Sequence, residues 1–315
     1  MNRSKFLSGI PLAIGTASTP ALASPQGANF AKLDDYLDYS QTPRDIVPQD
    51  FIEYLRQQSR FTTLDLAHIP KYAVILHDAY PEERLARIGV APSEWVEFEM
   101  GSTDPNLLYV VRSKGLGIDF ILNRGLPGAG GITTQAAELF ALGVEYVTHI
   151  GTCGLFRDRI AGGVPIISSG CIVDAGGFML SKSHPSRFAR PDSRLQGALR
   201  AAFARSKTST IEAVGYTIPI YYYQPSGLME ILATRNVSGH TIEYVEMEGG
   251  ALYELAAMAK GRAASVVIGV DRYRVSSSGI GKHQYLNVDE ASAKERSLRH
   301  VLEAYKGIES GQARL

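Results

Sequence analysis

Residues 245–251 read Val-Glu-Met-Glu-Gly-Gly-Ala and are followed by an apolar run that ends in an acidic residue. The spacing of apolar residues predicts a helix over 249–260, and the run at 264–270 predicts a buried strand that ends at Asp271. Glu246 and Glu248 therefore stand where a helix begins. Because ligands collect at the ends of strands in α/β sheets, these three carboxylates are candidate ligand-binding groups.

Two glycine-containing segments precede this one. Residues 124–131 read Arg-Gly-Leu-Pro-Gly-Ala-Gly-Gly, a predicted loop before a helix over 133–142, and residues 149–154 read His-Ile-Gly-Thr-Cys-Gly, at the end of a strand over 146–150. Further strands are predicted at 72–76, 107–111, 119–122, 164–167, 171–173 and 212–216, and helices at 48–58, 82–88, 193–205 and 290–305. This alternation predicts an α/β protein with three α/β/α layers.

The amino terminus has the pattern of an export signal. Arg3 and Lys5 precede an apolar stretch at 6–14, and Ala21-Leu22-Ala23 offers an A-x-A cleavage site. We expect a signal peptide at 1–23, a leader segment at 24–66 and a single domain at 67–315. The protein would then be secreted or periplasmic, and no later segment reaches the roughly 18 apolar residues of a membrane span.

The composition favours a small-molecule ligand. Lysine plus arginine and aspartate plus glutamate both number 32 of 315 residues, so no net charge attracts nucleic acid or a membrane surface. The two cysteines do not form a pair at zinc spacing, and no H-E-x-x-H motif or P-loop is present. We expect neither a metal nor a nucleic acid partner.

The segments at 124–131, 149–154 and 245–251, with a strand ending in Val270-Asp271-Arg272, resemble the nucleoside phosphorylase family of purine nucleoside phosphorylases, uridine phosphorylases and methylthioadenosine nucleosidases. The resemblance runs from about Tyr72 to the last predicted helix. It implies a mixed central sheet and phosphorolysis of nucleosides to free base and ribose 1-phosphate, with purines preferred and uridine also accepted. It further implies no cofactor, inorganic phosphate as co-substrate, and a homo-oligomer.

The resemblance also implies roles for individual residues. Glu248 would accept hydrogen bonds from the ribose hydroxyls, with Glu246 and Met247 completing the ribose site. Asp271 would assist protonation of the leaving base, with Tyr223 and Arg272 also at the base. From the residues alone, Glu246 and Glu248 suit a helix amino terminus equally well, where such a charge is worth about 0.3–1 kcal/mol.

The expected phosphate-binding residues form an incomplete set. The family loop P-G-D-P-x-R matches residues 77–84, where the glycine is absent and Arg84 remains; His149 stands where the family has an arginine, Thr152 keeps a hydroxyl, and Arg124 offers a replacement charge. Each lost hydrogen bond to phosphate costs about 1.5–3 kcal/mol, so water would compete as nucleophile. A hydrolytic nucleosidase, or a secreted storage or nucleoside-binding protein without catalysis, are the alternatives.

Overall fold

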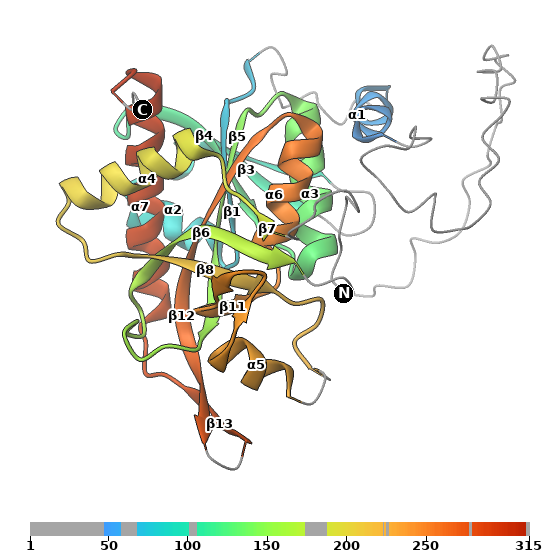
Figure 1. Ribbon diagram of the computed structural model, residues 1–315. Helices are drawn as coiled ribbons and strands as arrows, with labels where there is room; N and C mark the ends of the chain where they lie inside the picture. Colours follow the sequence, from blue (N-terminus) through green and yellow to red (C-terminus); the bar gives the residue numbers. More distant parts are fainter. Residues whose placement is uncertain are drawn as a thin grey trace, which may run out of the picture. The chain divides into compact units, whose positions relative to one another are not determined.

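The computed structural model describes residues 47–57, 68–100, 106–173, 188–222, 224, 227–276 and 279–312 (Figure 1). The expected signal peptide and most of the leader lie outside these residues, so those boundaries stay predictions. Within the described part, no helix combines the length and the hydrophobicity that crossing a bilayer requires.

Most of the described strands belong to one mixed sheet in the order β13-β12-β6-β8-β11-β5-β1-β4-β3-β2, with β7 beside β6. The strands are β1 (Tyr72–Leu76), β2 (Trp95–Met100), β3 (Asn106–Ser113), β4 (Ile118–Arg124), β5 (Tyr146–Leu155), β6 (Pro165–Val173), β7 (Phe188–Ala189), β8 (Ile211–Thr217), β11 (Tyr244–Glu246), β12 (Arg262–Ser276) and β13 (Gly279–Tyr285); β9 (Asn236–Val237) and β10 (His240–Thr241) form a separate pair. The helices are α1 (Pro48–Gln57), α2 (Pro81–Arg87), α3 (Gly128–Leu142), α4 (Ser193–Arg205), α5 (Leu228–Thr234), α6 (Gly249–Ala259) and α7 (Glu290–Glu309), with a 3-10 turn η3 (Pro92–Glu94).

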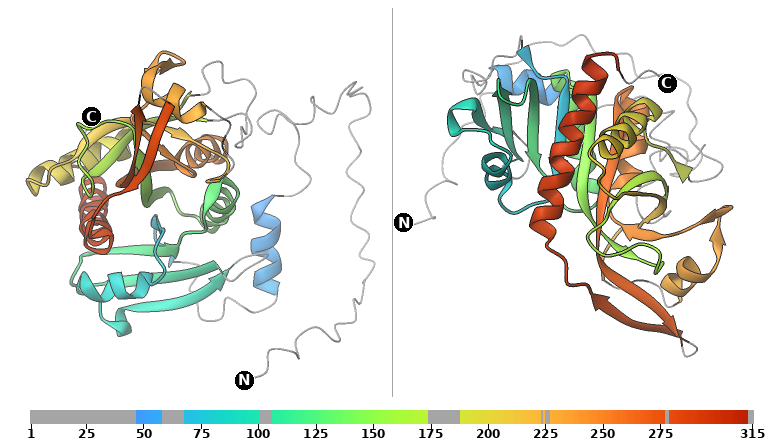
Figure 2. Two further views of the ribbon diagram at one scale, coloured as in Figure 1. Left: turned by 90° about the horizontal axis from the view of Figure 1, so that it is seen from below. Right: turned by 90° about the vertical axis from the view of Figure 1, so that its left-hand side faces the viewer.

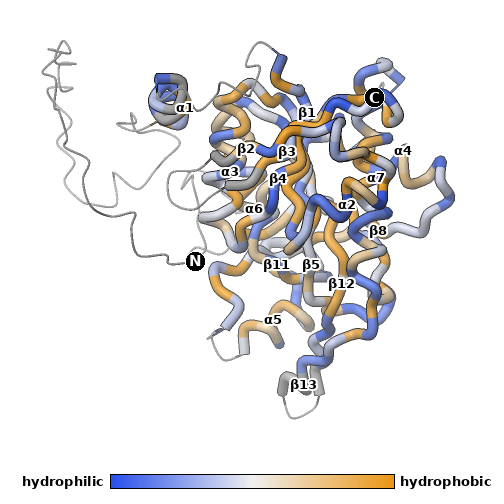
Figure 3. Tube along the Cα trace, turned by 180° about the vertical axis from the view of Figure 1, so that it is seen from behind, coloured by the Kyte–Doolittle hydropathy of each residue, from blue (hydrophilic) through white to orange (hydrophobic). Residues whose placement is uncertain are grey.

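Helices cover the sheet on both faces. Alternate residues of β1 point to opposite sides: Ala73 and Ile75 join a core with α3 and α6, whereas Val74 and Leu76 join a second core with α4 and α7. Figures 1 and 2 show these two helix pairs on either side of the strands, and Figure 3 shows hydrophobic residues along the central strands. The predicted three-layer α/β/α fold with a mixed sheet is confirmed.

Several predicted element boundaries were wrong. The segment 125–131 is not entirely loop, because α3 begins at Gly128, whose backbone N–H is satisfied by the distant Glu248 carboxylate at 2.7 Å. The two strands predicted at 164–167 and 171–173 are one strand, β6, whose register shifts between Ser168 and Gly170. Strand β5 continues through the expected glycine turn to Leu155. No prediction was made for α5, β2 or β13.

Strand β5 changes partner along its length. Its first half, Tyr146 to Ile150, pairs with β1, and Gly154 and Leu155 pair with β11, while its other edge stays on β12. Pairings β12–β6, β6–β8, β8–β11, β11–β5 and β5–β12 therefore close a ring, and β1 to β4 extend outward from it. A point where a strand changes neighbours is where α/β sheets open a ligand crevice.

Candidate active site

A cavity of about 300 Å³ opens where β5 passes from β1 to β11. Its wall is formed by residues at the carboxyl ends of β1 and β5, by the start of α6 and by β12. Its lining residues are His77, Pro127, Thr152, Cys153, Gly154, Ile218, Tyr221, Val245, Glu246, Met247, Glu248, Val270, Asp271, Tyr273 and Tyr285. The structure thus brings together five predicted site residues: Thr152, Glu246, Met247, Glu248 and Asp271.

The Glu246 carboxylate binds the start of α6 through hydrogen bonds. Its buried carboxylate accepts hydrogen bonds from the backbone N–H groups of Glu248 (2.7 Å) and Gly249, and from the hydroxyl of Thr217. Thr217, which is fully buried, also accepts from the N–H of Gly250 at 2.9 Å. Burial raises the pKa of Glu246 although these donors oppose the rise. This geometry matches a helix-capping carboxylate more closely than a ligand-binding one.

Glu248 is the more accessible of the two carboxylates. Its oxygens accept from the backbone N–H of Gly128 at 2.7 Å and of Met247 at 3.2 Å, and no side-chain donor of the described residues is recorded within hydrogen-bond distance. Burial, followed by the nearby charge of Glu246, raises the pKa of Glu248 to about 8. A hydroxyl group that donates a hydrogen bond to Glu248 would therefore stabilise its ionised form, which burial and the charge of Glu246 disfavour.

Asp271 presents one oxygen to the cavity and the other to a histidine. Its Oδ2 lies 2.5 Å from Nε2 of His283 on β13, and its buried Oδ1 has no hydrogen-bond partner among the described residues. Gly154 keeps the approach to Oδ1 clear, because a Cβ there would lie 2.8 Å from that oxygen. A buried unpaired carboxylate oxygen in a cavity wall is a strong binding signal.

Aromatic rings surround this acidic end of the cavity. Tyr221, Tyr273 and Tyr285 line it, and the ring centroid of His283 lies 5.1 Å from that of Tyr273 and 4.6 Å from that of Tyr285. These rings provide apolar faces for a planar ligand. The predicted stacking residue, Tyr223, lies outside the described residues.

One histidine of the lining, His77, packs against a buried histidine, His149. The His77 ring, directly after β1, lies 4.8 Å from the buried His149 ring of β5, and a Cβ at Gly125 would come within 1.6 Å of it. Burial, and then the positive charge of Lys294, lowers the pKa of His77 to about 4. Burial lowers the pKa of His149 well below its usual value. Both rings are therefore neutral near pH 7.

The predicted cationic residues stand outside the cavity lining. Arg84 is buried and its Nε donates to Asp78 at 2.8 Å, which lowers the pKa of Asp78 although burial opposes this, while Nη1 has no partner among the described residues. Arg124 is exposed. Arg272, on the opposite side of β12 from its neighbour Asp271, binds the Asp158 carboxylate at 2.5 Å and the carbonyl of Ile160.

His77, His149 and Glu248 are the group within the described residues that comes nearest to a metal site. One potential ligand atom from each lies within 4.8 Å of the others. Ligands of a tetrahedral zinc ion, bound at about 2.0–2.1 Å, are roughly 3.3 Å apart, so these side chains would have to move closer to hold one.

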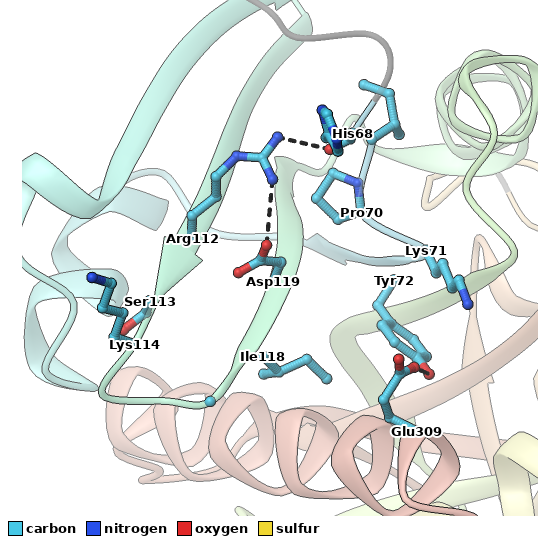
Figure 4. Close-up of a pocket in the computed structure, with 12 residues that line it drawn as sticks. His68, Pro70, Lys71, Tyr72, Arg112, Ser113, Lys114, Ile118, Asp119 and Glu309 are labelled. Carbon is cyan, nitrogen blue, oxygen red and sulfur yellow. Dashed lines mark hydrogen bonds and ion pairs between the residues drawn. The ribbon is translucent and has the colours of Figure 1, made fainter.

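A larger hollow of about 770 Å³ lies at the other end of the sheet, where β1 and β4 begin (Figure 4). Arg112 spans it and bonds Asp119 at 3.3 Å and the carbonyl of His68 at 2.7 Å, and the Tyr72 hydroxyl donates to Glu309 at 2.7 Å. Because these polar groups already bind one another, we assign the candidate site to the smaller cavity.

Comparison with known proteins agrees with this fold. No family model matches the chain. The DeoD-type purine nucleoside phosphorylase of Hahella chejuensis is 29% identical over 141 residues, which cover 44% of this chain and 57% of that protein, so the match spans a little over half the relative. The crystal structure of purine nucleoside phosphorylase from Toxoplasma gondii, in complex with immucillin-H, covers 78% of this chain and 94% of its own at a TM-score of 0.60 and 14% identity.

The structural match defines the class of protein: an α/β protein with the nucleoside phosphorylase fold. Over the 141 matched residues, the sequence is also similar to the DeoD-type purine nucleoside phosphorylase. The activity of this chain does not follow from the fold alone, because one fold supports several reactions.

Proposed function

We propose that this protein binds a nucleoside in the cavity and cleaves its N-glycosidic bond, with purine nucleosides preferred. The observation that carries the proposal is the placement of two carboxylates with spare acceptor capacity, Glu248 and Asp271, in the wall of one cavity of about 300 Å³. Cleavage passes through an oxocarbenium-like state, so it needs a group that holds the sugar and a group that assists the leaving base.

The roles follow from the position of each group. Glu248 would accept hydrogen bonds from ribose hydroxyls, and these strengthen as positive charge develops on the sugar. Met247, which lines the cavity, would pack on the sugar. The base would lie among Tyr221, Tyr273 and Tyr285, with Asp271 Oδ1 at its edge.

The geometry favours water as nucleophile. Among the described lining residues there is no lysine or arginine, whereas Glu246, Glu248 and Asp271 are acidic. A phosphate dianion would enter an acidic cavity without a charged partner, which is unfavourable at low dielectric. In addition, the neutral His77 ring fills the space beside Gly125 and His149 where the family resemblance predicts phosphate. We therefore propose hydrolysis to free base and ribose.

Phosphorolysis is the second candidate, and one observation favours it. Arg84, in α2, has a buried Nη1 without a partner among the described residues, and its Nε is bound to Asp78, two residues after β1. Rotation of His77 out of its present position would open the space beside Gly125 and His149 to an anion. Arg84 would then supply the charge, with the Thr152 hydroxyl facing the cavity.

The decisive experiment incubates the protein with inosine, adenosine and uridine, with and without phosphate. We expect inosine and adenosine to be cleaved to base and ribose at a rate independent of phosphate, and Glu248→Gln to lose most of that activity. Glu212→Gln, a change of the same kind at an exposed position of β8, serves as control. Ribose 1-phosphate as the product would establish phosphorolysis. Binding of nucleosides in calorimetry without cleavage would replace the enzyme by a binding protein.

Export and assembly remain proposals of their own. We propose removal of residues 1–23 in the native host, which mass spectrometry of an intact Met1 would contradict. We also propose a homo-oligomer, for which sedimentation at the mass of a single chain would be the contrary result.

A further inference from the structure

Asp271 and His283 form a close pair, and the proposed function assigns no role to His283. His283 lies on β13 opposite Tyr273 of β12, and its Nε2 is 2.5 Å from Asp271 Oδ2 and 3.1 Å from the hydroxyl of Tyr221. The imidazole is 27% exposed, whereas the Asp271 side chain is 7% exposed. The pair thus runs from a buried oxygen at the cavity to a ring that reaches solvent.

The two oxygens of Asp271 face different surroundings. Oδ1 is buried in the cavity wall without a partner among the described residues, and Oδ2 is bound by the histidine. A carboxylate oxygen and an imidazole nitrogen this close are joined by one hydrogen bond, along which a proton can pass. Because Asp271 itself has almost no contact with water, a proton that leaves Oδ1 has to be replaced through another group.

Resting on the proposed function, we propose that His283 is the relay that returns a proton to Asp271 for each departing base. Asp271 gives its proton to a ring nitrogen of the base as the bond from C1′ to the base nitrogen breaks and that electron pair moves to the base. His283 then passes its Nε2 proton to the carboxylate and takes one from solvent. In hydrolysis the attacking water binds C1′ and releases one proton to solvent, so the proton count closes.

The residues around the His283 imidazole are compatible with proton transfer to Asp271. The described titratable groups that face His283 are Asp271 and Tyr273 on β12, Tyr285 on its own strand, and Tyr221 from the segment after β8. Three of these four are tyrosines, and Asp271 is the carboxylate among them. His283 acts through Asp271 and has no place at the reacting atoms, so it is a positioning and relay residue.

The test compares two substrates that differ in their need for a proton. Inosine needs its base protonated as it leaves, whereas 7-methylinosine already carries the positive charge on its base. We expect His283→Gln, which keeps a hydrogen-bond donor but cannot relay, to lower kcat/KM for inosine by about tenfold or more and for 7-methylinosine by less than about twofold. Gln284→Ala, on the same strand and exposed, is the matched control.

The outcomes separate the relay from the proposed function. Equal losses for both substrates, or no loss for inosine, would overturn the relay while leaving nucleoside cleavage in place. If the parent protein cleaves neither substrate, the proposed function fails and the relay fails with it. His283→Asn provides the same comparison if the glutamine variant does not fold, which thermal unfolding of each variant would reveal.

Discussion

The raised pKa of Glu248 predicts a pH dependence of catalysis that can be calculated in advance. Ribose hydroxyls donate to the ionised carboxylate, and with a pKa of about 8 only about 1% of the free protein is ionised at pH 6, against about half at pH 8. With 4-nitrophenyl β-D-ribofuranoside, whose leaving group needs no proton, kcat/KM should therefore rise about fiftyfold from pH 6 to pH 8 and level off above pH 9.

Glu248→Gln tests this assignment directly. The variant should lose about a hundredfold or more of kcat/KM at pH 9 and show no rise between pH 6 and pH 8, because its amide does not titrate. Glu212→Gln should keep both the rate and the rise. A Glu248→Gln variant that retains the same rising limb would show that another group titrates, and the reasoning would be wrong.

The same group links stability to pH. Because folding raises the pKa of Glu248 from 4.5 to about 8, its contribution to stability is complete below pH 4.5 and is lost as the pH rises through about 8. Between pH 6 and pH 9 the free energy of unfolding should fall by about 3 kcal/mol more in the parent than in Glu248→Gln, measured by urea titration. Equal falls in both proteins would contradict the assignment.

Three further predictions address the rest of the site. Thr217→Val removes the hydroxyl that joins Glu246 to the N–H of Gly250 and should cost about 2–4 kcal/mol of unfolding free energy in urea; a loss below about 0.5 kcal/mol would argue against this cap. His77→Gly should make cleavage depend on phosphate and yield ribose 1-phosphate, detected by chromatography, whereas products unchanged from the parent would show that the ring does not exclude phosphate. Incubation with EDTA should leave the rate of inosine cleavage unchanged, because the proposed hydrolysis assigns no role to a metal ion; loss of activity with recovery on adding zinc would reverse this conclusion.

The fold could be predicted from sequence because buried strands such as β1 are continuous apolar runs. The roles of Glu248 and Asp271 were implied by the family resemblance. The strand end predicted at Asp271 was wrong, because β12 continues to Ser276. The start of α3 could not be predicted in this way, since Gly128 is held by a carboxylate 120 residues away. Long-range hydrogen bonds of this kind leave no local signal in the sequence.

Sequence analysis missed His283 because its place in the site depends on the pairing of two strands. His283 meets Asp271 only because β12 and β13 form a hairpin, and residues 276–279, Ser-Ser-Ser-Gly, were the available turn signal. The resemblance implied that Arg272 lies at the base together with Asp271, but Arg272 binds Asp158, because neighbours on a strand face opposite sides. The two-residue period of a strand predicts that Asp271 and Arg272 point to opposite sides of β12.

The ring of strand pairings around β5 also determines which parts of the protein can move during a catalytic cycle. Each strand of the ring is held along two edges, so none can separate without breaking two ladders at once. Amide hydrogens of β5 and of the first half of β12 should then exchange only when the whole chain unfolds, which holds the backbone beside the reacting bond nearly rigid. The β12–β13 hairpin extends beyond the ring, and β13 is paired along one edge only among the described strands. This hairpin, which places Tyr285 in the lining of the cavity, is therefore the part of the cavity wall that the sheet restrains least.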